Sequence, residues 1–174
     1  MTVVGDGDLR GAMERSVADL VLDRRVWFTG AQPNAAVLGL LAKSDAYLMP
    51  SAFEGLSVGM LEAMAHGVVP VVSAIRSGVP DIIVPGENGL VAPVGDIAAF
   101  ADRLEWLWKH PAERVRMATA AVATVDSGYR ADQMIDRYVD LFRRIVASPI
   151  ARPTGPIVPP RHLAPELTWS LWAS

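Results

Sequence analysis

The chain has 174 residues, of which 51% are apolar and 20% charged, so it can bury a sizeable core and shows no disorder signature. Its formal net charge of -3 argues against a nucleic-acid partner, and the absence of cysteine excludes disulfide scaffolds, thiolate zinc sites and cysteine nucleophiles. The opening MTVVGDGDLR has no signal-peptide pattern, and no uncharged apolar stretch reaches the ~18 residues of a membrane-spanning helix.

Short β-branched runs alternate with helical patterns along the chain, which indicates βαβ units and a parallel sheet. Taken in order, the predicted strands are Thr2–Gly5, Arg25–Phe28, Ala46–Met49, Val68–Val72 and Gly89–Val91. The predicted helical segments are Leu9–Leu22, Asn34–Ala42, Ser57–His66, Gly78–Val84, Asp96–Lys109, Ala112–Val125 and Ala131–Val146. The fold class predicted from this order is α/β, a Rossmann-like doubly wound sheet flanked by helices. Large side chains at helical spacing are predicted to lie in the core, namely Met60, Met64, Trp106 and Trp108.

The composition changes after Ala147. Residues 148–174 hold six of the thirteen prolines, which is typical of an extended tail. We therefore expect a folded domain over residues 1–147 and a proline-rich tail over residues 148–174.

The stretch that carries chemistry is PSAFEGLSVGMLEAMAHG, residues 50–67. It places Glu54 in a loop after a parallel strand and Glu62 inside the helix that follows. The first turn of that helix offers unpaired backbone N–H groups and the positive end of the helix dipole, which suit a pyrophosphate. In doubly wound sheets, ligands bind at the carboxyl ends of strands, where this loop lies.

Each of the two glutamates has a second interpretation. Glu62 is flanked by apolar residues, so the helix could be buried and its carboxylate would need donors such as ribose hydroxyls. Alternatively, Glu62 points to solvent on a half-exposed helix. Glu54 could bind a ligand or could serve only the helix dipole, a contribution of about 0.3–1 kcal/mol.

Glu54 and Glu62 resemble the E-x7-E motif of retaining family-4-type glycosyltransferases. The similarity extends in order through TVVGDGDLR, VWFTG, SDAYLMPS and SGVPDIIVPGENGLVAPVGD, so that it covers about residues 2–145; Asp81 stands where glutamate is commoner. The resemblance implies the C-terminal, nucleotide-sugar-binding half of the two-domain GT-B fold.

By this resemblance, Glu54 is the catalytic residue, near the donor sugar's hydroxyls, and Glu62 binds the ribose. The backbone amides of Gly55, Leu56, Ser57 and Val58 would hold the diphosphate. Near the nucleobase and its adjoining turn, the resemblance implies Gly30, Ala31, Gln32, Gly5 and Gly7. It implies transfer with retention of configuration from a nucleotide sugar, without cofactor or bound metal, in bacterial-type polysaccharide or glycolipid biosynthesis. The predicted location is the cytoplasm, with peripheral attachment at the inner membrane face as an alternative.

The sequence also departs from the family pattern. The strand–turn–helix unit with the arginine and lysine that hold the donor phosphates is not present, nor is the N-terminal acceptor-binding domain. In the doubly wound order 3-2-1-4-5-6 this unit supplies the central strand. Thr2–Gly5 and Ala46–Met49 would then each face a gap, and three outcomes are open: a marginally stable chain, which we favour, a strand supplied by a second chain, or direct pairing of the two strands. We expect the isolated chain to be inactive without the acceptor domain or a partner chain.

Two other functions remain open on the sequence. A non-catalytic nucleotide-sugar-binding domain, or one half of a split enzyme, would carry the same motif. A serine hydrolase is a remote alternative, because GLSVG matches G-x-S-x-G and Ser57, Asp81 and His110 follow hydrolase order. The dinucleotide-binding fingerprint is broken, since Gly5 and Gly7 are followed by Gly11 rather than by a glycine at position 10.

Overall fold

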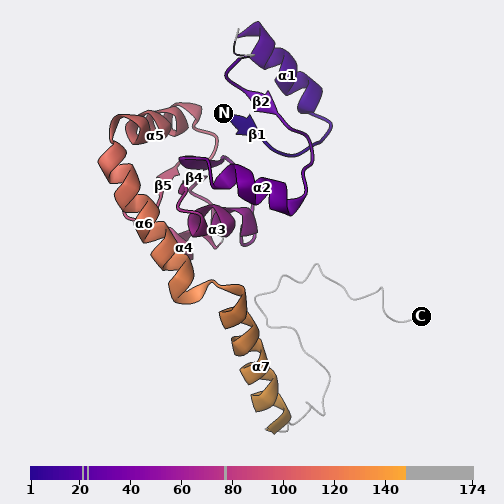
Figure 1. The fold of residues 1–174 in the computed structure, drawn as a ribbon, viewed down its shortest axis with the longest axis vertical. Helices are drawn as coiled ribbons and strands as arrows, with labels where there is room; N and C mark the ends of the chain where they lie inside the picture. Colours follow the sequence, from indigo (N-terminus) through magenta and orange to yellow (C-terminus); the bar gives the residue numbers. More distant parts are fainter. Residues whose placement is uncertain (21, 23, 77, 148–174) are drawn as a thin grey trace, which may run out of the picture. The chain divides into compact units, whose positions relative to one another are not determined.

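The computed structural model describes residues 1–20, 22, 24–76 and 78–147. It is an α/β structure with two parallel sheets flanked by helices, as the sequence predicts (Figure 1). The chain divides into two compact units after Met134. The predicted proline-rich tail, residues 148–174, lies outside the described residues, so the predicted domain boundary stays a prediction.

The first sheet consists of β1 (Thr2–Val3) and β2 (Trp27–Phe28), connected through α1 (Arg10–Asp19). The two strands are parallel, with Thr2 opposite Trp27. Beyond the strands, the Gly5 amide donates to the Gly30 carbonyl at 2.9 Å in an isolated bridge. Both glycines have positive φ, 126° and 69°, a conformation that glycine adopts without steric strain.

The second sheet has the order β3-β4-β5, with β3 at Ala46–Met49, β4 at Val69–Ser73 and β5 at Leu90–Ala92. Every residue of the central strand β4 is buried, which fits a strand covered on both faces. Successive β4 side chains point to opposite faces, so Val72 packs in one cluster and Val71 in another.

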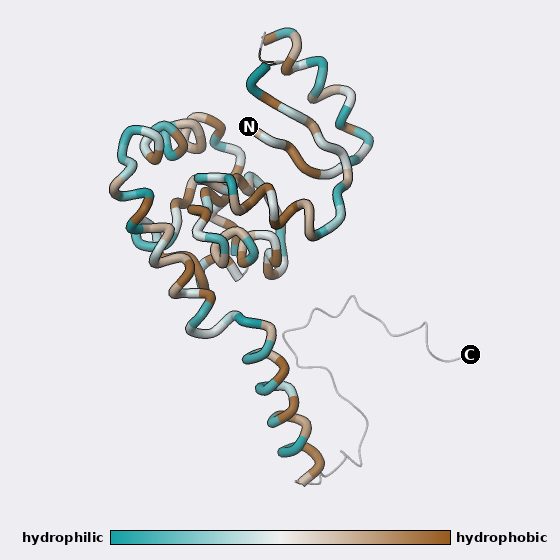
Figure 2. Tube along the Cα trace, viewed as in Figure 1, coloured by the Kyte–Doolittle hydropathy of each residue, from teal (hydrophilic) through white to brown (hydrophobic). Residues whose placement is uncertain are grey.

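Helices cover both faces of this sheet. The cluster around Val72 includes residues of α3 (Val58–Ala65), α4 (Val79–Ile82) and α6 (Pro111–Gly128). The cluster around Val71 includes residues of α5 (Ile97–Lys109) and again α6. A third cluster joins α3 to α2 (Asn34–Leu41) through Leu41, Ala63 and Val68. Figure 2 shows the apolar β4 segment enclosed by these helices.

The strand order agrees with the predicted topology. In the doubly wound order 3-2-1-4-5-6, β2 and β1 take positions 3 and 2, and β3, β4 and β5 take positions 4, 5 and 6. Within the described residues, no strand occupies the central position and β1 does not pair with β3. The outcome in which these two strands pair directly is therefore not observed, while marginal stability and a strand from a second chain stay predictions.

Some predicted element bounds were wrong by one or more residues, for local reasons. The fourth strand begins at Val69 because the Val68 amide closes the end of α3 by donating to the Ala63 carbonyl at 3.0 Å. The second strand begins only at Trp27 because the Arg25 and Val26 amides are both turned toward the Leu22 carbonyl.

The predicted core is correct for the methionines and wrong for one tryptophan. Met60 and Met64 are fully buried, and Trp106 packs partly against the core, but Trp108 is 74% exposed. The packed face of α5 carries Leu104 and Leu107. Trp108 follows Leu107 by one position, about 100° further around the helix, and so leaves that face.

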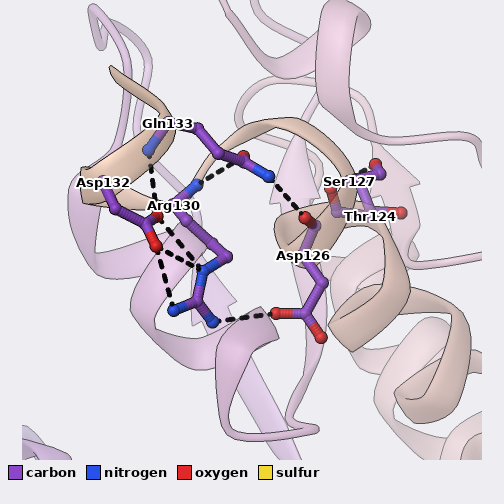
Figure 3. A network of polar contacts seen from close by, with 6 residues as sticks. All are labelled: Thr124, Asp126, Ser127, Arg130, Asp132 and Gln133. Carbon is purple, nitrogen blue, oxygen red and sulfur yellow. Dashed lines mark hydrogen bonds and ion pairs between the residues drawn. The ribbon is translucent and has the colours of Figure 1, made fainter. Parts of the chain in front are cut away.

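A polar network fixes the turn between α6 and α7 (Ala131–Ala147), as Figure 3 shows. The Arg130 guanidinium contacts the carboxylates of both Asp126 and Asp132, at 3.5 and 3.2 Å. The Gln133 side-chain amide donates to the Asp126 carbonyl at 2.8 Å.

No helix in the described part of the chain is long and apolar enough to cross a membrane. The location predicted from the sequence stays a prediction.

Candidate functional site

The candidate site is built around the start of α3, directly after the loop that follows β3. Ser57 is the N-cap of α3, and its hydroxyl accepts a hydrogen bond from the Met60 amide at 3.2 Å. Serine is favoured at this position because its oxygen satisfies one of the amides that the first turn leaves without an intrahelical acceptor. Leu56 and Val58, on either side of the cap, are 51% and 64% exposed, so the first turn is open to a ligand.

The loop before α3 is braced from α4. The Gly78 amide donates to the Gly55 carbonyl at 3.3 Å, and a side chain at Gly78 would come within 2.9 Å of Leu56. A side chain at this position would therefore require the Leu56 side chain to move. The contact holds the backbone of residues 55 and 56 beside the N-terminus of α3.

Glu54 and Glu62 both belong to this site, and a neutral side chain orients each of them. The Ser51 hydroxyl donates to Glu54 Oε1 at 2.9 Å, and the Asn34 amide donates to Glu62 Oε1 at 3.0 Å. Both glutamates are half-buried. A carboxylate has about four lone-pair positions, so each can still accept further hydrogen bonds from a ligand.

The environment of Glu62 matches neither of its two predicted interpretations fully. The side chain does not simply point to solvent, because it is half-buried and bonded to Asn34 on the neighbouring helix α2. Its donor within the described chain is therefore an amide that the sequence analysis missed. Asn34 begins α2 after Pro33, and nothing in its local pattern indicates a contact with α3.

Tyr47 of β3 is a second residue that the sequence analysis missed. Burial raises the pKa of its hydroxyl, and the negative charges of Glu54 and Glu62 add to this shift, while interaction with the Ser57 side chain opposes it. Both carboxylates and the cap of α3 are therefore close enough to the Tyr47 hydroxyl to influence its pKa. The sequence could have indicated this role, because Tyr47 stands in an otherwise apolar strand and a tyrosine hydroxyl needs a partner when its ring is buried.

The other predicted site residues gather at the end of the first sheet. Gly5 and Gly30 form the bridge described above, and Gly7 donates its amide to the Asp6 carboxylate at 2.9 Å. Ala31 and Gln32 follow Gly30 in the chain, and the Gln32 side-chain amide donates to the Thr29 carbonyl at 2.7 Å. Within the described residues, these hydrogen bonds stay inside the segment 1–32 and do not join it to Glu54 or Glu62.

The three residues of the hydrolase alternative have other partners. Ser57 caps α3, and the His110 ring stacks on Trp106 and places Nδ1 2.8 Å from its carbonyl. Asp81 lies in the first turn of the short helix α4 and is exposed. The geometry therefore gives no support to a serine nucleophile. In the described part of the chain, no three histidine or carboxylate side chains converge in a way that could hold a metal ion.

The family profile of the glycosyl transferases group 1 matches residues 1–123. The chain belongs to this family. Among its curated relatives is the amylovoran biosynthesis glycosyltransferase AmsK of Erwinia amylovora, 32% identical over 150 residues, which are 83% of this chain and 37% of AmsK. The chain spans less than half the length of AmsK and of the other curated relatives compared with it.

Solved structures of the family's fold superpose on the chain. The C-terminal domain of the group 1 family protein LpcC from Francisella tularensis is 25% identical, with a TM-score of 0.66, and the match covers 71% of this chain and 64% of that domain. Anabaena HepE in complex with UDP-glucose is 20% identical, with a TM-score of 0.76, covering 82% of this chain and 40% of HepE. These similarities confirm the predicted fold class, a Rossmann-like half of the GT-B fold.

Proposed function

We propose that this chain is the donor-binding part of a retaining, family-4-type glycosyltransferase, and that its nucleotide-sugar site lies at the N-terminus of α3. One observation carries the proposal. Glu54 and Glu62 are both half-buried beside the exposed first turn of α3, and each is oriented by a neutral donor that leaves lone pairs for a ligand.

The parts of this site suit different parts of a nucleotide sugar. The amides of residues 55–58 and the positive end of the α3 dipole favour the diphosphate. The Glu62 carboxylate accepts hydrogen bonds from the ribose hydroxyls, and Glu54 accepts them from the donor sugar. Gly5, Gly7, Gly30, Ala31 and Gln32 contribute backbone around the nucleobase. Charge on the leaving diphosphate is then stabilised by oriented amides, without a cofactor or metal.

The relatives support a role in polysaccharide or glycolipid synthesis. AmsK is named for amylovoran biosynthesis, and LpsE of Rhizobium meliloti, 32% identical over 139 residues, for lipopolysaccharide core biosynthesis. Structures of HepE contain UDP or UDP-glucose. Because the chain spans 37% of AmsK, we propose that the acceptor is bound by a separate domain or partner chain.

Calorimetric titration with UDP-, GDP- and ADP-sugars and the corresponding bare nucleotides tests this proposal. Glu62→Ala should weaken binding of a bare nucleotide by about 10–100-fold, because hydrogen bonds to a charged group contribute about 1.5–3 kcal/mol. Glu54→Ala should affect the bare nucleotide little and the intact nucleotide sugar more. Glu105→Ala, an exposed change on α5, is the matched control.

Two results would contradict the proposal. The site is wrong if Glu54→Ala and Glu62→Ala weaken binding of the bare nucleotide equally, or if no nucleotide binds the wild-type chain. The purified 174-residue chain should bind donor without transferring sugar. A non-catalytic binding domain shares this behaviour, but it would remain inactive when the acceptor domain of a relative is supplied.

A further inference from the structure

Tyr47 has an environment that the roles proposed above do not use. It lies on β3, in register with Pro70 of β4, and its ring packs against two of the three core clusters. Its hydroxyl leaves the core at α3, where it interacts with Ser57 and with the two carboxylates of the site. A side chain that is packed in the core therefore reaches the first turn of α3, where the candidate site lies.

Gly59, in the first turn of α3, shows how close this contact is. A Cβ atom at Gly59 would lie 3.0 Å from the Tyr47 hydroxyl oxygen and 3.8 Å from the ring carbon that carries it. The first distance is tighter than ordinary van der Waals contact, and the second is ordinary. The Tyr47 hydroxyl is therefore the atom that crowds position 59, where a Cβ fits only if one of the two groups shifts by a few tenths of an ångström.

Gly59 is otherwise a poor choice for this position. Glycine inside a helix is less favourable than alanine by about 1 kcal/mol, because it loses more backbone freedom on folding. Gly59 has no positive φ that would require glycine. A residue with low helix propensity therefore stands where the Tyr47 hydroxyl approaches α3. Residues that are unfavourable for their secondary structure are expected at functional sites.

The hydroxyl also has the protonation state that a supporting group needs. Burial, Glu54 and Glu62 all raise the pKa of Tyr47 above its ordinary value, so the phenol stays neutral at physiological pH. A neutral phenol can both donate and accept a hydrogen bond. It can therefore support the Ser57 hydroxyl, which itself accepts from the Met60 amide.

We propose that Tyr47 is a positioning residue, whose hydroxyl holds Ser57 and Gly59 and so fixes the first turn of α3 in the conformation that presents its amides to the donor diphosphate. The assignment to the diphosphate rests on the proposed function. The effect on the first turn of α3 does not, so the two can be tested separately.

Hydrogen exchange of the unliganded chain tests the support of α3. Tyr47→Phe should accelerate exchange of the Met60 and Leu61 amides, which donate to the Ser57 hydroxyl and carbonyl, by about 2–10-fold and leave Val71 and Val72 of β4 unchanged. Tyr129→Phe is the matched control, because it removes a hydroxyl that donates to the Asp81 carbonyl at 3.2 Å, outside the site. Unchanged exchange at Met60 and Leu61 in Tyr47→Phe would overturn the proposal, and so would a uniform acceleration that includes β4.

A double-mutant cycle tests the contact itself. Gly59→Ala should lower the melting temperature in the wild-type background, because the new methyl group meets the Tyr47 hydroxyl. In the Tyr47→Phe background the same change should raise it, because the methyl group then makes an ordinary contact and the helix gains propensity. An equal effect of Gly59→Ala in both backgrounds would overturn the proposal.

Binding measurements test the diphosphate assignment. Tyr47→Phe should weaken binding of a nucleoside diphosphate (UDP, GDP or ADP) by about 2–10-fold, and binding of the corresponding nucleoside by less than twofold. Equal losses for both ligands overturn this assignment. Should none of these nucleotides bind the wild type, the proposed function fails, while the exchange and melting experiments still decide whether Tyr47 positions α3.

Discussion

The two sheets of the first unit bury very different amounts of apolar surface. All five residues of β4 are buried, and Met60 and Met64 pack on that sheet with no exposure. In the first sheet, by contrast, α1 has no buried residue and Trp27 is 56% exposed. An open apolar groove remains between α1 and β1–β2, lined by residues such as Met13 and Phe28.

This difference indicates where the stability of the chain resides. Burial of apolar surface is the main favourable term in folding, so the second sheet with its helices forms a core by itself. The first sheet has two strands of two residues each, and isolated two-stranded pairs are marginally stable. The carboxylates of the candidate site both lie on the well-packed side, where their positions are fixed most firmly.

The largest expected effect comes from removing core volume on the two sides. Met64→Ala should lower the free energy of unfolding by about 2–5 kcal/mol, because it removes buried contacts and leaves a cavity. Met13→Ala, at a side chain that is 46% exposed on α1, should lower it by less than about 1 kcal/mol. Urea unfolding followed by circular dichroism measures both. Comparable losses would show that the first sheet is as well packed as the second.

A somewhat smaller effect is expected from buried polar groups. Asn88 is 3% exposed; its side chain donates to the Ile82 carbonyl and the Thr124 hydroxyl and accepts from the Val84 amide. Asn88→Ala leaves buried partners unsatisfied and should destabilise the fold by about 2–4 kcal/mol. Thr29→Val, which removes a half-buried hydroxyl in the first sheet, should change stability by less than about 1 kcal/mol. Thermal melts of the two variants would compare these effects directly.

Ligand affinity extends the comparison to the site. Glu62→Ala should weaken nucleotide binding by about 10–100-fold, whereas Gln32→Ala should weaken it by less than about threefold. The reason is that the Gln32 side-chain amide already donates to the Thr29 carbonyl, and the role proposed for Gln32 uses its backbone rather than its side chain. Calorimetry with the same nucleotide measures both variants. A larger loss for Gln32→Ala would move the main binding contacts to the first sheet.

The smallest effect is a pH dependence at the turn between α6 and α7. Hydrogen bonding to Arg130 holds the pKa of Asp132 below its ordinary value of 3.8. Because the folded-state pKa of Asp132 is lower than its unfolded value, the ion pair stabilises the fold at pH values above the unfolded pKa. This stability is lost as the pH falls through the folded pKa. Asp132→Asn should therefore show a shallower loss of melting temperature between about pH 5 and pH 3 than the wild type. An identical acid profile for both proteins would show that the ion pair adds no stability.

The sequence alone was enough to predict much of the fold. Alternating apolar runs and helical patterns gave the five strands in the correct order, and Ala46–Met49 matches β3 at both ends. The predicted start of the fourth strand was wrong because the Val68 amide bonds to the preceding helix instead of the sheet. The predicted burial of Trp108 was wrong because this residue lies outside the packed face of α5. Hydropathy patterns report which residues are apolar, but not which amide will cap the preceding helix.

The candidate site was predicted only in part. Spacing placed Glu54 and Glu62 around the start of one helix, because residues close in sequence have a predictable geometry there. Asn34 and Tyr47 come from α2 and β3, and Asn34 is 28 residues from the carboxylate to which it donates. No local pattern encodes such contacts.

The sequence by itself determined the element order, the helix that carries both carboxylates and, through its resemblance to a known family, membership of the glycosyl transferases. These features depend on periodicity and on short-range spacing, which the order of residues fixes directly. Only the tertiary structure decided that Glu62 accepts from Asn34, that the Tyr47 hydroxyl crowds position 59, and that one sheet is packed while the other stays open. Each of these depends on distances between helices and strands that packing sets. The same local sequence is compatible with more than one packing arrangement of its neighbours.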